Sequence, residues 1–305
     1  MRVVAALGGN AVARPDEPLD VEHQRAAVRR AAEALAAIAS QHDLVVTHGN
    51  GPQVGLLALQ SGGTMPLDVL DAETEGMIGY WIDQELGNRL PGREVATLLT
   101  QVLVDPDDPA FASPSKPIGP VYPEAEARRL SDERGWELRE DRGGFRRVVP
   151  SPDPREIREL RTIEILVNLG VVVICAGGGG IPVVEDASGA LHGVEAVIDK
   201  DLATELLATR LGADALLLLT DVPGVYEDWP EPARRLIRAI PPRECDALSL
   251  HPGTMGPKVR AAQRFALTPG RFAAIGSLED AERLLRREAG TVVSSDVAKR
   301  EVEER

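Results

Sequence analysis

The chain contains few aromatic side chains and few cysteines. Phenylalanine, tryptophan and tyrosine make up 3% of the 305 residues, so a hydrophobic core has to be built from alanine, valine, leucine and isoleucine. The two cysteines, Cys175 and Cys245, are too few for a disulfide framework or for a zinc site made of cysteines. Hydrophobic residues make up 43% and charged residues 27%, as in ordinary globular proteins. This length suits one large α/β domain or two smaller ones.

Positive charge is also scarce, with a formal net charge of −14. Non-specific binding to nucleic acid or to an anionic membrane needs clustered cations that neutralise phosphates. The apolar N-terminus is short and is interrupted by Gly8, Gly9 and Asn10. It therefore predicts a first strand, and neither a signal peptide nor a membrane span. We expect a cytoplasmic protein whose partners include no nucleic acid and no membrane.

Three common catalytic motifs are missing. The sequence has no Gly-x-x-x-x-Gly-Lys-Ser/Thr loop, no Gly-x-Gly-x-x-Gly fingerprint and no Gly-x-Ser-x-Gly elbow. These absences argue against a P-loop nucleotide site, a Rossmann dinucleotide site and an α/β-hydrolase. The five histidines are scattered and give no pair at the spacing of metal ligands.

Lysine is rare in a chain that uses arginine freely. Only four of the 34 basic residues are lysines, namely Lys116, Lys200, Lys258 and Lys299. Lysine offers a compact point charge that arginine does not imitate. Lys299 lies in the charged tail, whereas the other three lie in turn-like settings rich in glycine, proline or aspartate. These three are candidate functional residues, and a solvated surface charge is the alternative interpretation of each.

Strand-like and helix-like segments alternate along the chain. Apolar runs typical of buried strands occupy residues 3–7, 44–47, 95–104, 171–176, 215–220, 272–275 and 291–293. Segments with helical character occupy residues 21–39, 52–60, 73–90, 157–169, 202–211, 258–266 and 279–287. This order predicts an α/β fold, a three-layer αβα sandwich with an open, mainly parallel sheet. Ligands of such sheets bind outside the carboxyl ends of the strands.

Residues 105–150 interrupt the alternation. They are rich in proline, acidic residues and arginine, with little periodicity outside residues 124–135. A structureless loop of this length is unusual inside a domain. We therefore expect a small protruding subdomain, a lid, inserted into a single domain that spans residues 1–305. The charged residues 296–305 are expected to fray or to extend a terminal helix.

Three glycine-rich turns follow predicted strands. They are Gly8-Gly9-Asn10, Gly49-Asn50-Gly51 and Gly177-Gly178-Gly179-Gly180. Glycine lets the backbone approach an anion closely, successive N–H groups bind its oxygens, and a following helix N-terminus adds partial positive charge. Any one of these turns taken alone could equally be a tight turn between a strand and a helix, with no ligand. Because three fall at the same predicted sheet edge, we favour an oxyanion or phosphate site there.

Asp199 and Asp201 flank Lys200 immediately before a predicted helix. Phosphoryl transfer needs positive charge on the transferring group and on the leaving phosphate, and lysine supplies it without covalent chemistry. The two acids could orient Lys200, or hold magnesium through water or phosphate. They could equally be a plain helix N-cap and first-turn acid. The sequence leaves these interpretations open.

Weaker candidates are His48, Tyr226 and the helix around residues 77–86. His48 lies between a strand and a glycine turn, where it could bind an anion or satisfy the turn backbone. Tyr226 could face a nucleotide base or pack in its loop. Residues 77–86 are apolar around most of the predicted helix, which indicates burial, for instance in a subunit interface.

Several stretches together carry a family resemblance over nearly the whole chain. They are residues 6–11, 48–55, 76–81, 116–120, 146–152, 177–182, 193–201 and 255–259. With these motifs the chain resembles the carbamate kinases of the amino-acid kinase superfamily. The resemblance implies an open, mainly parallel αβα sandwich with a protruding subdomain, assembled as a homodimer. It also implies reversible phosphoryl transfer between ATP and carbamate, giving ADP and carbamoyl phosphate, with Mg²⁺.

The resemblance further implies roles for individual residues. Lys200 and Lys258 would contact the nucleotide phosphates and the transferring group, and Asp201 would organise both lysines. Lys116 would reach the carbamoyl phosphate from the protruding subdomain. The other implied contacts are backbone N–H groups of Gly8, Gly9, Asn10, Gly49, Asn50, Gly51, Gly178 and Gly179 for substrate oxygens, and Asp221, Tyr226 and Met255 for the nucleotide. No residue is assigned as a metal ligand.

One position separates this chain from many amino-acid kinases, which resemble one another in having lysine before the first Leu-Gly-Gly. Here that position is Ala6, and Lys116 is the natural source of the missing cation. This favours a carbamate kinase over a kinase acting on an acyl carboxylate. A catalytically silent nucleotide-binding relative is expected to lose one or more of the three candidate lysines, and all three are present. A dehydrogenase would need the missing fingerprint and its ribose-binding acid.

Overall fold

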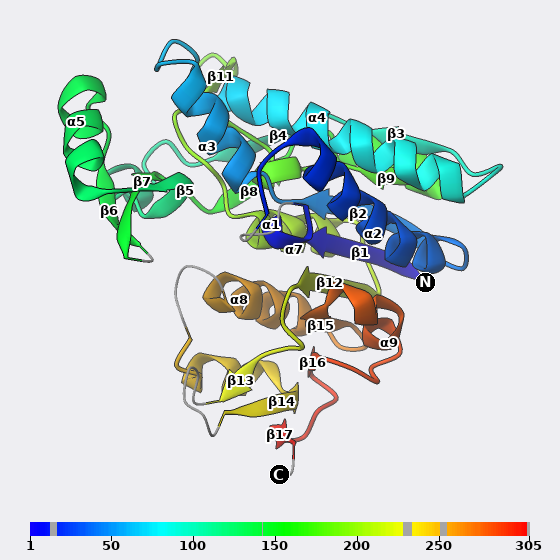
Figure 1. The fold of residues 1–305 in the computed structure, drawn as a ribbon. Coiled ribbons are helices and arrows are strands. Elements are labelled where there is room, and N and C mark those ends of the chain that lie inside the picture. Colours follow the sequence, from blue (N-terminus) through cyan, green and yellow to red (C-terminus); the bar gives the residue numbers. More distant parts are fainter. Residues whose placement is uncertain (13–16, 142, 228–233, 251–254, 304–305) are drawn as a thin grey trace.

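The computed structural model describes residues 1–12, 17–141, 143–227, 234–250 and 255–303 (Figure 1). The side chains of Asn10 and Ala11 lie outside this description. The helices are α1 (Gly9–Val12), α2 (Val21–Ala39), α3 (Gly51–Gln60), α4 (Leu67–Arg89), α5 (Glu124–Arg134), α6 (Leu160–Asn168), α7 (Lys200–Arg210), α8 (Met255–Ala266) and α9 (Ala281–Leu285), with 3-10 helices η1 (Pro109–Phe111), η2 (Gly177–Gly179), η3 (Pro242–Ala247) and η4 (Leu278–Asp280).

The strands are β1 (Arg2–Leu7), β2 (Asp43–His48), β3 (Val95–Thr97), β4 (Gln101–Val104), β5 (Lys116–Tyr122), β6 (Leu138–Asp141), β7 (Gly144–Val149), β8 (Pro154–Ile157), β9 (Val172–Ile174), β10 (Ile181–Glu185), β11 (Leu191–Gly193), β12 (Ala215–Thr220), β13 (Tyr226–Glu227), β14 (Arg235–Ile240), β15 (Phe272–Ser277), β16 (Thr291–Ser294) and β17 (Glu301–Val302). Over the described residues they form three sheets, of ten, four and three strands.

The ten-stranded sheet is open and mainly parallel, as the sequence predicts. Its order is β13-β14-β16-β15-β12-β1-β2-β9-β3, with β17 beside β14. Strand β1 lies at the centre and pairs in parallel with β2 and β12, so that Val4 lies beside Val45 and Leu216. Antiparallel pairing occurs between β15 and β16, and where β13 and β17 join β14. The continuous apolar runs of β1 and β12 fit strands that are covered on both faces.

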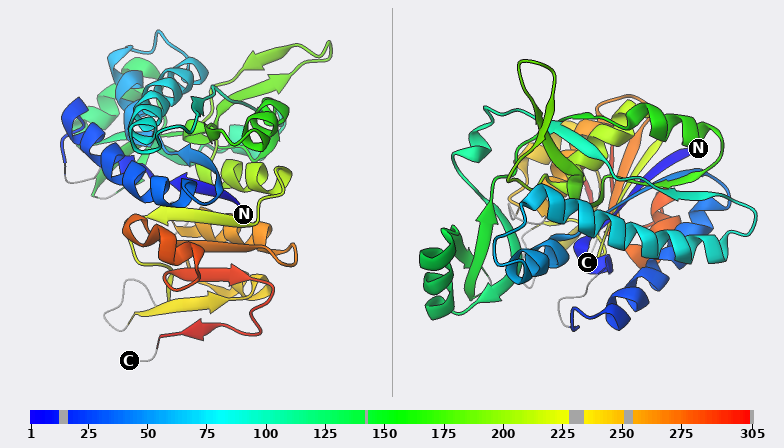
Figure 2. Two further views of the ribbon diagram at one scale, coloured as in Figure 1. Left: turned by 90° about the vertical axis from the view of Figure 1, so that its right-hand side faces the viewer. Right: turned by 90° about the horizontal axis from the view of Figure 1, so that it is seen from above.

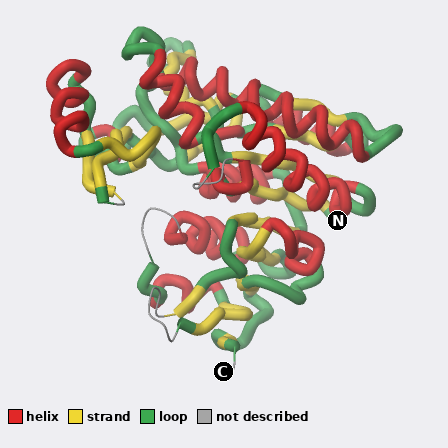
Figure 3. Tube along the Cα trace, viewed as in Figure 1, coloured by secondary structure: helices red, strands yellow, loops and turns green. Residues whose placement is uncertain are grey.

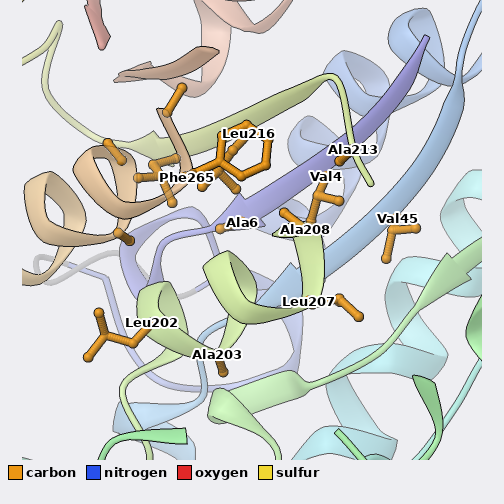
Figure 4. Packing of buried hydrophobic residues seen from close by; sticks show 14 of the residues in the cluster. Val4, Ala6, Val45, Leu202, Ala203, Leu207, Ala208, Ala213, Leu216 and Phe265 are labelled. Carbon is orange, nitrogen blue, oxygen red and sulfur yellow. The ribbon is translucent and has the colours of Figure 1, made fainter. Parts of the chain in front are cut away.

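Two hydrophobic cores lie on the two faces of this sheet. One contains Val4, Ala6 and Leu216 together with apolar residues of α6, α7 and α8 (Figure 4). The other contains Val3, Ala5 and residues of α2, α4 and α9. Alternate residues of β1 thus point to opposite cores, as the two-residue repeat of a strand requires. Figure 2 shows the helices on either side of the sheet and confirms the three-layer αβα arrangement.

Residues 95–104 are not the single long strand that their apolar pattern predicts. They form β3, which pairs with β9 in the large sheet, and β4, which pairs with β8 and β10 in the four-stranded sheet. The chain changes sheet near Thr100, whose N–H donates to the carboxylate of Glu75 at 3.1 Å and not to a neighbouring strand. The local sequence does not distinguish one strand from two here, because the strand is interrupted by a hydrogen bond between Thr100 and Glu75 of α4.

Residues 105–150 also contain more regular structure than their sequence suggests. They include the antiparallel sheet β5-β7-β6 and helix α5, which lie at one end of the molecule in Figure 1 and are seen in Figure 3 as a red helix beside yellow strands. Strand β5 approaches α3 very closely, since a Cβ atom on Gly55 would lie 1.9 Å from Cα of Gly119. Gly119 has a φ of 72°, a left-handed value that favours glycine. The two glycines therefore permit this backbone contact.

The C-terminal tail differs from expectation. Residues 301 and 302 form β17, which pairs with β14, and the tail extends no helix as far as residue 303, where the described part of the chain ends. The last predicted helix, residues 279–287, is present but shorter, because α9 covers only Ala281–Leu285 and is preceded by η4. Exposed charged side chains are compatible with an edge strand, so charge alone did not identify β17. None of the described helices is both long and apolar enough to cross a membrane.

Candidate active site

The three glycine turns come together at the carboxyl edge of the large sheet. Gly8 follows β1, Gly49 follows the neighbouring parallel strand β2, and η2 follows β9 on the far side of β2. A Cβ atom on Gly49 would lie 3.0 Å from the backbone nitrogen of Gly9, and one on Gly178 would lie 2.2 Å from Nδ2 of Asn50. The turns thus touch one another where ligands of open α/β sheets bind.

Two lysines share one carboxylate beside these turns. Lys200 and Asp201 open α7, and Lys258 lies in the first turn of α8. Nζ of Lys200 lies 2.6 Å from Oδ1 of Asp201, and Nζ of Lys258 lies 2.8 Å from Oδ2. Each carboxylate oxygen therefore holds one ammonium group, and the two cations are kept close together.

A third lysine reaches this cluster from β5. Nζ of Lys116 lies 2.5 Å from Oδ2 of Asp199. Oδ1 of Asp199 accepts the backbone N–H of Asp201 at 2.9 Å, which caps α7. The sequence left open whether Asp199 and Asp201 orient Lys200, hold magnesium, or are a helix cap and a first-turn acid. Asp199 is the cap of α7 and pairs with Lys116, whereas the acid that pairs with Lys200 is Asp201.

Burial makes the charges of this cluster effective. The side chains of Lys200 and Asp201 are 10% and 6% exposed. Burial lowers the pKa of Lys200 to about 8, although the charge of Asp201 acts in the opposite direction. Burial would raise the pKa of Asp201, but Lys200 and Lys258 hold that pKa far below its usual range. Burial likewise opposes charging of Lys258, and Asp201 more than compensates, so that the pKa of Lys258 is raised.

A second buried network supports the glycine turns from α4. Oε1 of Glu75 accepts the N–H of Gly177 at 2.8 Å, and Oε2 accepts the N–H of Thr100 at 3.1 Å. Nδ2 of Asn50 donates to Oδ1 of Asp71 and to Oγ1 of Thr74, both at 2.9 Å. All these side chains are buried. The network connects α4 to the turns that follow β2 and β9.

Burial also sets the protonation of this network. It raises the pKa of Glu75 to about 8 and the pKa of Asp71 well above its ordinary value. It lowers the pKa of His48 to about 4, so this imidazole is neutral near pH 7. His48 touches η2, since a Cβ atom on Gly177 would lie 2.4 Å from the imidazole. His48 therefore supports the turn without carrying charge.

Asp71, Thr74 and Glu75 are residues of this site that the sequence patterns did not indicate. The helix is predicted to be largely apolar and to begin at residue 73, whereas α4 begins at Leu67. The missed signal is the spacing of three and four residues, which places these polar side chains on one face of a helix that is otherwise mostly apolar. Their partners lie at Asn50, Thr100 and Gly177, which local patterns do not reveal.

The residues predicted on the nucleotide side lie on several elements. Asp221 follows β12, and its charge contributes to the raised pKa of Lys258. Met255 opens α8 and packs against the core. Tyr226 lies on β13, where the guanidinium carbon of Arg234 is 5.2 Å from the ring centre. The predicted roles of these three residues in nucleotide binding remain predictions. Asn10 lies in α1, and its side chain is outside the described part of the chain.

The chain matches the model of the amino acid kinase family over residues 1–268. It is 52% identical to the carbamate kinase of Rhizobium meliloti (strain 1021), over 97% of this chain and 94% of that protein. It is 51% identical to the carbamate kinase of Haemophilus influenzae, over 96% and 97%. The solved carbamate kinase of Giardia lamblia bound to citric acid is 42% identical, with a TM-score of 0.89 over 96% of this chain and 98% of that one. The chain therefore belongs to the amino acid kinase family and, within it, to the carbamate kinases.

Proposed function

We propose that this chain catalyses reversible phosphoryl transfer between ATP and carbamate, giving ADP and carbamoyl phosphate. The observation that carries the proposal is the sharing of Asp201 by Lys200 and Lys258, at 2.6 and 2.8 Å, beside the glycine turns. Two ammonium groups held by one carboxylate offer positive charge to a phosphoryl group and to the leaving phosphate. The family to which the chain belongs supports carbamate as the acceptor.

The transfer is a direct in-line displacement with no covalent enzyme intermediate. An oxygen of carbamate forms the new bond to the γ-phosphorus of ATP, and the bond from that phosphorus to the bridging oxygen of ADP breaks. Lys200 and Lys258 stabilise charge on the transferring group and on ADP. Backbone N–H groups of Gly9 and Gly178 are proposed to hold oxygens of the small acceptor. The predicted donors Gly8 and Gly49 are already occupied, because their N–H groups donate to the carbonyl oxygens of Leu219 and Leu7 at 3.0 Å each. The remaining donors proposed at this edge are those of Asn10, Asn50 and Gly51, whereas the N–H of Gly179 donates to the carbonyl oxygen of Ala176 at 3.1 Å.

Mg²⁺ fits this centre as a companion of the nucleotide. The two acids of the cluster, Asp199 and Asp201, both form ion pairs with lysines. No group of three or more metal-ligating side chains occurs among the described residues. This donor set suits an ion bound through phosphate oxygens and water. When bound, Mg²⁺ neutralises charge on the phosphates, while Lys200 and Lys258 orient them.

The nucleotide is proposed to extend from the lysines toward β12, β13 and α8. Asp221 lies close enough to Lys258 to affect its pKa. Tyr226 is proposed to face the adenine, and Met255 to line the same side. A carbamate kinase of Giardia lamblia that has been solved with AMP-PNP, an ATP analogue, is 41% identical to this chain with a TM-score of 0.86. This relative supports an adenine nucleotide as the ligand.

Residues 105–150 are proposed to act as a lid within the single domain 1–305. The lid would bring Lys116 to the carbamoyl phosphate, where this lysine supplies the cation that Ala6 does not. The ion pair of Lys116 with Asp199 supports this role, because Asp199 also caps the helix that carries Lys200 and Asp201.

A homodimer is proposed to form through the outer edge of the large sheet. Tyr80 on α4 and Leu99 are 53% and 52% exposed. A Cβ atom on Gly76, one helical turn before Tyr80, would lie 3.8 Å from Leu99, so both apolar groups border one surface. Analytical ultracentrifugation measures the assembly, and Leu99→Asp should shift it toward monomer. The substrates ATP and ADP support a cytoplasmic location.

ATP formation by purified protein from ADP, Mg²⁺ and carbamoyl phosphate tests the proposed function. Lys200→Ala should lower turnover by at least about 10²–10³-fold, the typical effect of removing one group that stabilises transition-state charge. Lys299→Ala, at an exposed position, is the matched control. Well-folded wild-type protein that binds nucleotide but forms no ATP would instead indicate another acid acceptor or a regulatory role.

A further inference from the structure

The side-chain amide of Asn50 is held in one orientation by α4. Its Nδ2 donates to Oδ1 of Asp71 and to Oγ1 of Thr74, both at 2.9 Å. An amide nitrogen has two N–H groups, so these two bonds use its full donor capacity. The hydroxyl of Thr74 also lies 3.0 Å from the carbonyl oxygens of Leu70 and Asp71, to which it donates. The lone pairs of the Thr74 hydroxyl therefore face Asn50. The side chain of Asn50 must for this reason turn its amide nitrogen, and not its oxygen, toward Thr74.

The carbonyl oxygen of Asn50 is consequently the atom left for a ligand. Among the described residues, none donates a hydrogen bond to Oδ1 of Asn50. The amide lies against Gly178, since a Cβ atom there would be 2.2 Å from Nδ2 and 2.6 Å from Oδ1. Gly178 is one of the glycines proposed to hold substrate oxygens. Oδ1 of Asn50, a hydrogen-bond acceptor, thus lies beside a backbone N–H group that is proposed to bind a substrate oxygen.

Among the described residues, the amide of Asn50 is the one hydrogen-bond partner of the Asp71 side chain. The residue is 1% exposed, its Oδ1 accepts from Asn50, and its Oδ2 has no hydrogen-bond partner in the part of the chain that the structure describes. An unpartnered buried carboxyl oxygen costs free energy, so its presence calls for an explanation. Burial raises the pKa of Asp71 well above its ordinary value, which favours the uncharged form of this carboxyl group. The function of the side chain therefore lies in accepting one hydrogen bond.

We propose that Asp71 and Thr74 are positioning residues that aim Oδ1 of Asn50 at the amino group of carbamate. The inference rests on the proposed function. Carbamate differs from acetate in having an amino group where acetate has a methyl group. An oriented acceptor accepts a hydrogen bond from the amino group of carbamate, but it is left unpaired beside the methyl group of acetate. Sites of this kind discriminate strongly between two such substrates. Asn50 thereby makes the site selective for an acceptor that carries an N–H donor.

The test compares two phosphoryl donors, carbamoyl phosphate and acetyl phosphate, each with ADP. Both reactions give ATP and a free carboxylate, so only the amino and methyl groups differ. In wild-type protein kcat/KM should be higher for carbamoyl phosphate. Asp71→Ala and Thr74→Val should each lower the ratio of the two kcat/KM values by about tenfold or more. KM for ADP should remain near its wild-type value.

Conservative variants separate positioning from general support of the fold. Asp71→Asn and Thr74→Ser keep an acceptor for Asn50 and should keep the wild-type ratio. Asp83→Ala removes an acid from a distant turn of α4, where it accepts from Thr97, and should also leave the ratio unchanged. If Asp71→Ala does not fold, Thr74→Val carries the test alone.

Loss of activity by the same factor with both donors, in either removal variant, would overturn the inference and leave the proposed function intact. Equal use of the two donors by wild-type protein would have the same consequence. Failure of wild-type protein to form ATP from carbamoyl phosphate would overturn the proposed function and the inference together.

Discussion

At the scale of single residues, Asp201 organises the centre. It is buried between two ammonium groups, one on each carboxylate oxygen. Removing one partner of a buried ion pair leaves an uncompensated charge, and here the loss of Asp201 would leave two. The carboxylate therefore allows two like charges to lie close together, as the proposed transfer of one phosphoryl group requires. Asp199 plays the corresponding part for Lys116 while it caps α7.

Lys200 should give the reaction a dependence on pH. Burial lowers its pKa to about 8, so the ammonium group loses its proton as the pH rises through about 8. The charged form binds phosphate, and kcat/KM for ADP is therefore expected to fall above pH 8. The fall in kcat should come at higher pH, because bound phosphate stabilises the ammonium group. Initial rates measured from pH 6 to pH 10 at several ADP concentrations check both values.

Lys200→Arg provides the control for this pH profile. A guanidinium stays protonated throughout the range, so this variant should be slower but should lose the decline above pH 8. If kcat/KM of the Lys200→Arg variant falls with the same midpoint pH as in wild type, the group that titrates is not Lys200.

At the scale of elements, α4 works as a support for the turns that follow β2 and β9. Its side chains hold Asn50 in one turn and the backbone N–H of Gly177 in another. The turn η2 needs such support, because Ala176, Gly178, Gly179 and Gly180 all have positive φ. A left-handed conformation at the non-glycine Ala176, with φ of 50°, costs free energy that its surroundings must offset.

Glu75→Gln should weaken η2. One of the two acceptor oxygens becomes an NH₂ group that faces the N–H of Gly177 or Thr100, so a buried donor loses its partner. The free energy of unfolding is expected to fall by roughly 1–3 kcal/mol, together with turnover. Urea unfolding and ATP formation measure the two effects. Glu73→Gln, at an exposed position on the same helix, is the matched control and should change neither.

The same variant should change how stability depends on pH. The pKa of Glu75 rises from its ordinary value of 4.5 in the unfolded chain to about 8 in the folded protein. Its contribution to stability is therefore fully present below pH 4.5 and is lost as the pH rises toward 8. The stability advantage of wild type over Glu75→Gln should shrink between pH 5 and pH 8. An advantage that grows over this range would contradict the raised pKa.

At the scale of the whole molecule, residues 105–150 and the sheet edge meet through Lys116. This lysine is separated from Asp199 by 83 positions in sequence, yet the two side chains lie 2.5 Å apart. The glycine contact between Gly55 and Gly119 fixes the strand that carries Lys116 against α3. The inserted segment thereby contributes a cation to a centre otherwise built by α7 and α8.

Lys116→Ala should weaken the use of carbamoyl phosphate more than the binding of ADP, because the lysine is proposed to lie on the acceptor side. The expected result is a raised KM for carbamoyl phosphate and a nearly unchanged KM for ADP. Steady-state rates with each substrate varied in turn measure this difference, with Lys299→Ala as control. The reverse pattern would place Lys116 on the nucleotide side.

The sequence by itself determined the local elements and the main candidates for chemistry. Apolar runs ending in glycine identified β1, β2 and β9 with their turns, because strand burial and turn geometry depend on neighbouring residues. The scarcity of lysine singled out Lys116, Lys200 and Lys258. The alternation of strands and helices gave the mainly parallel αβα sandwich, since parallel strands need crossover connections.

Only the tertiary structure decided which distant groups meet. It divided residues 95–104 between two sheets, placed the charged tail in β17, and brought Glu75 to Gly177 across 102 positions. It also showed that Asp71 and Thr74 orient Asn50. Periodicity indicates which face of an element is buried, but the partner on that face is chosen by the packing of the whole chain. For this reason the lysines could be singled out from the sequence as candidate site residues, whereas the supporting acids of α4 could not.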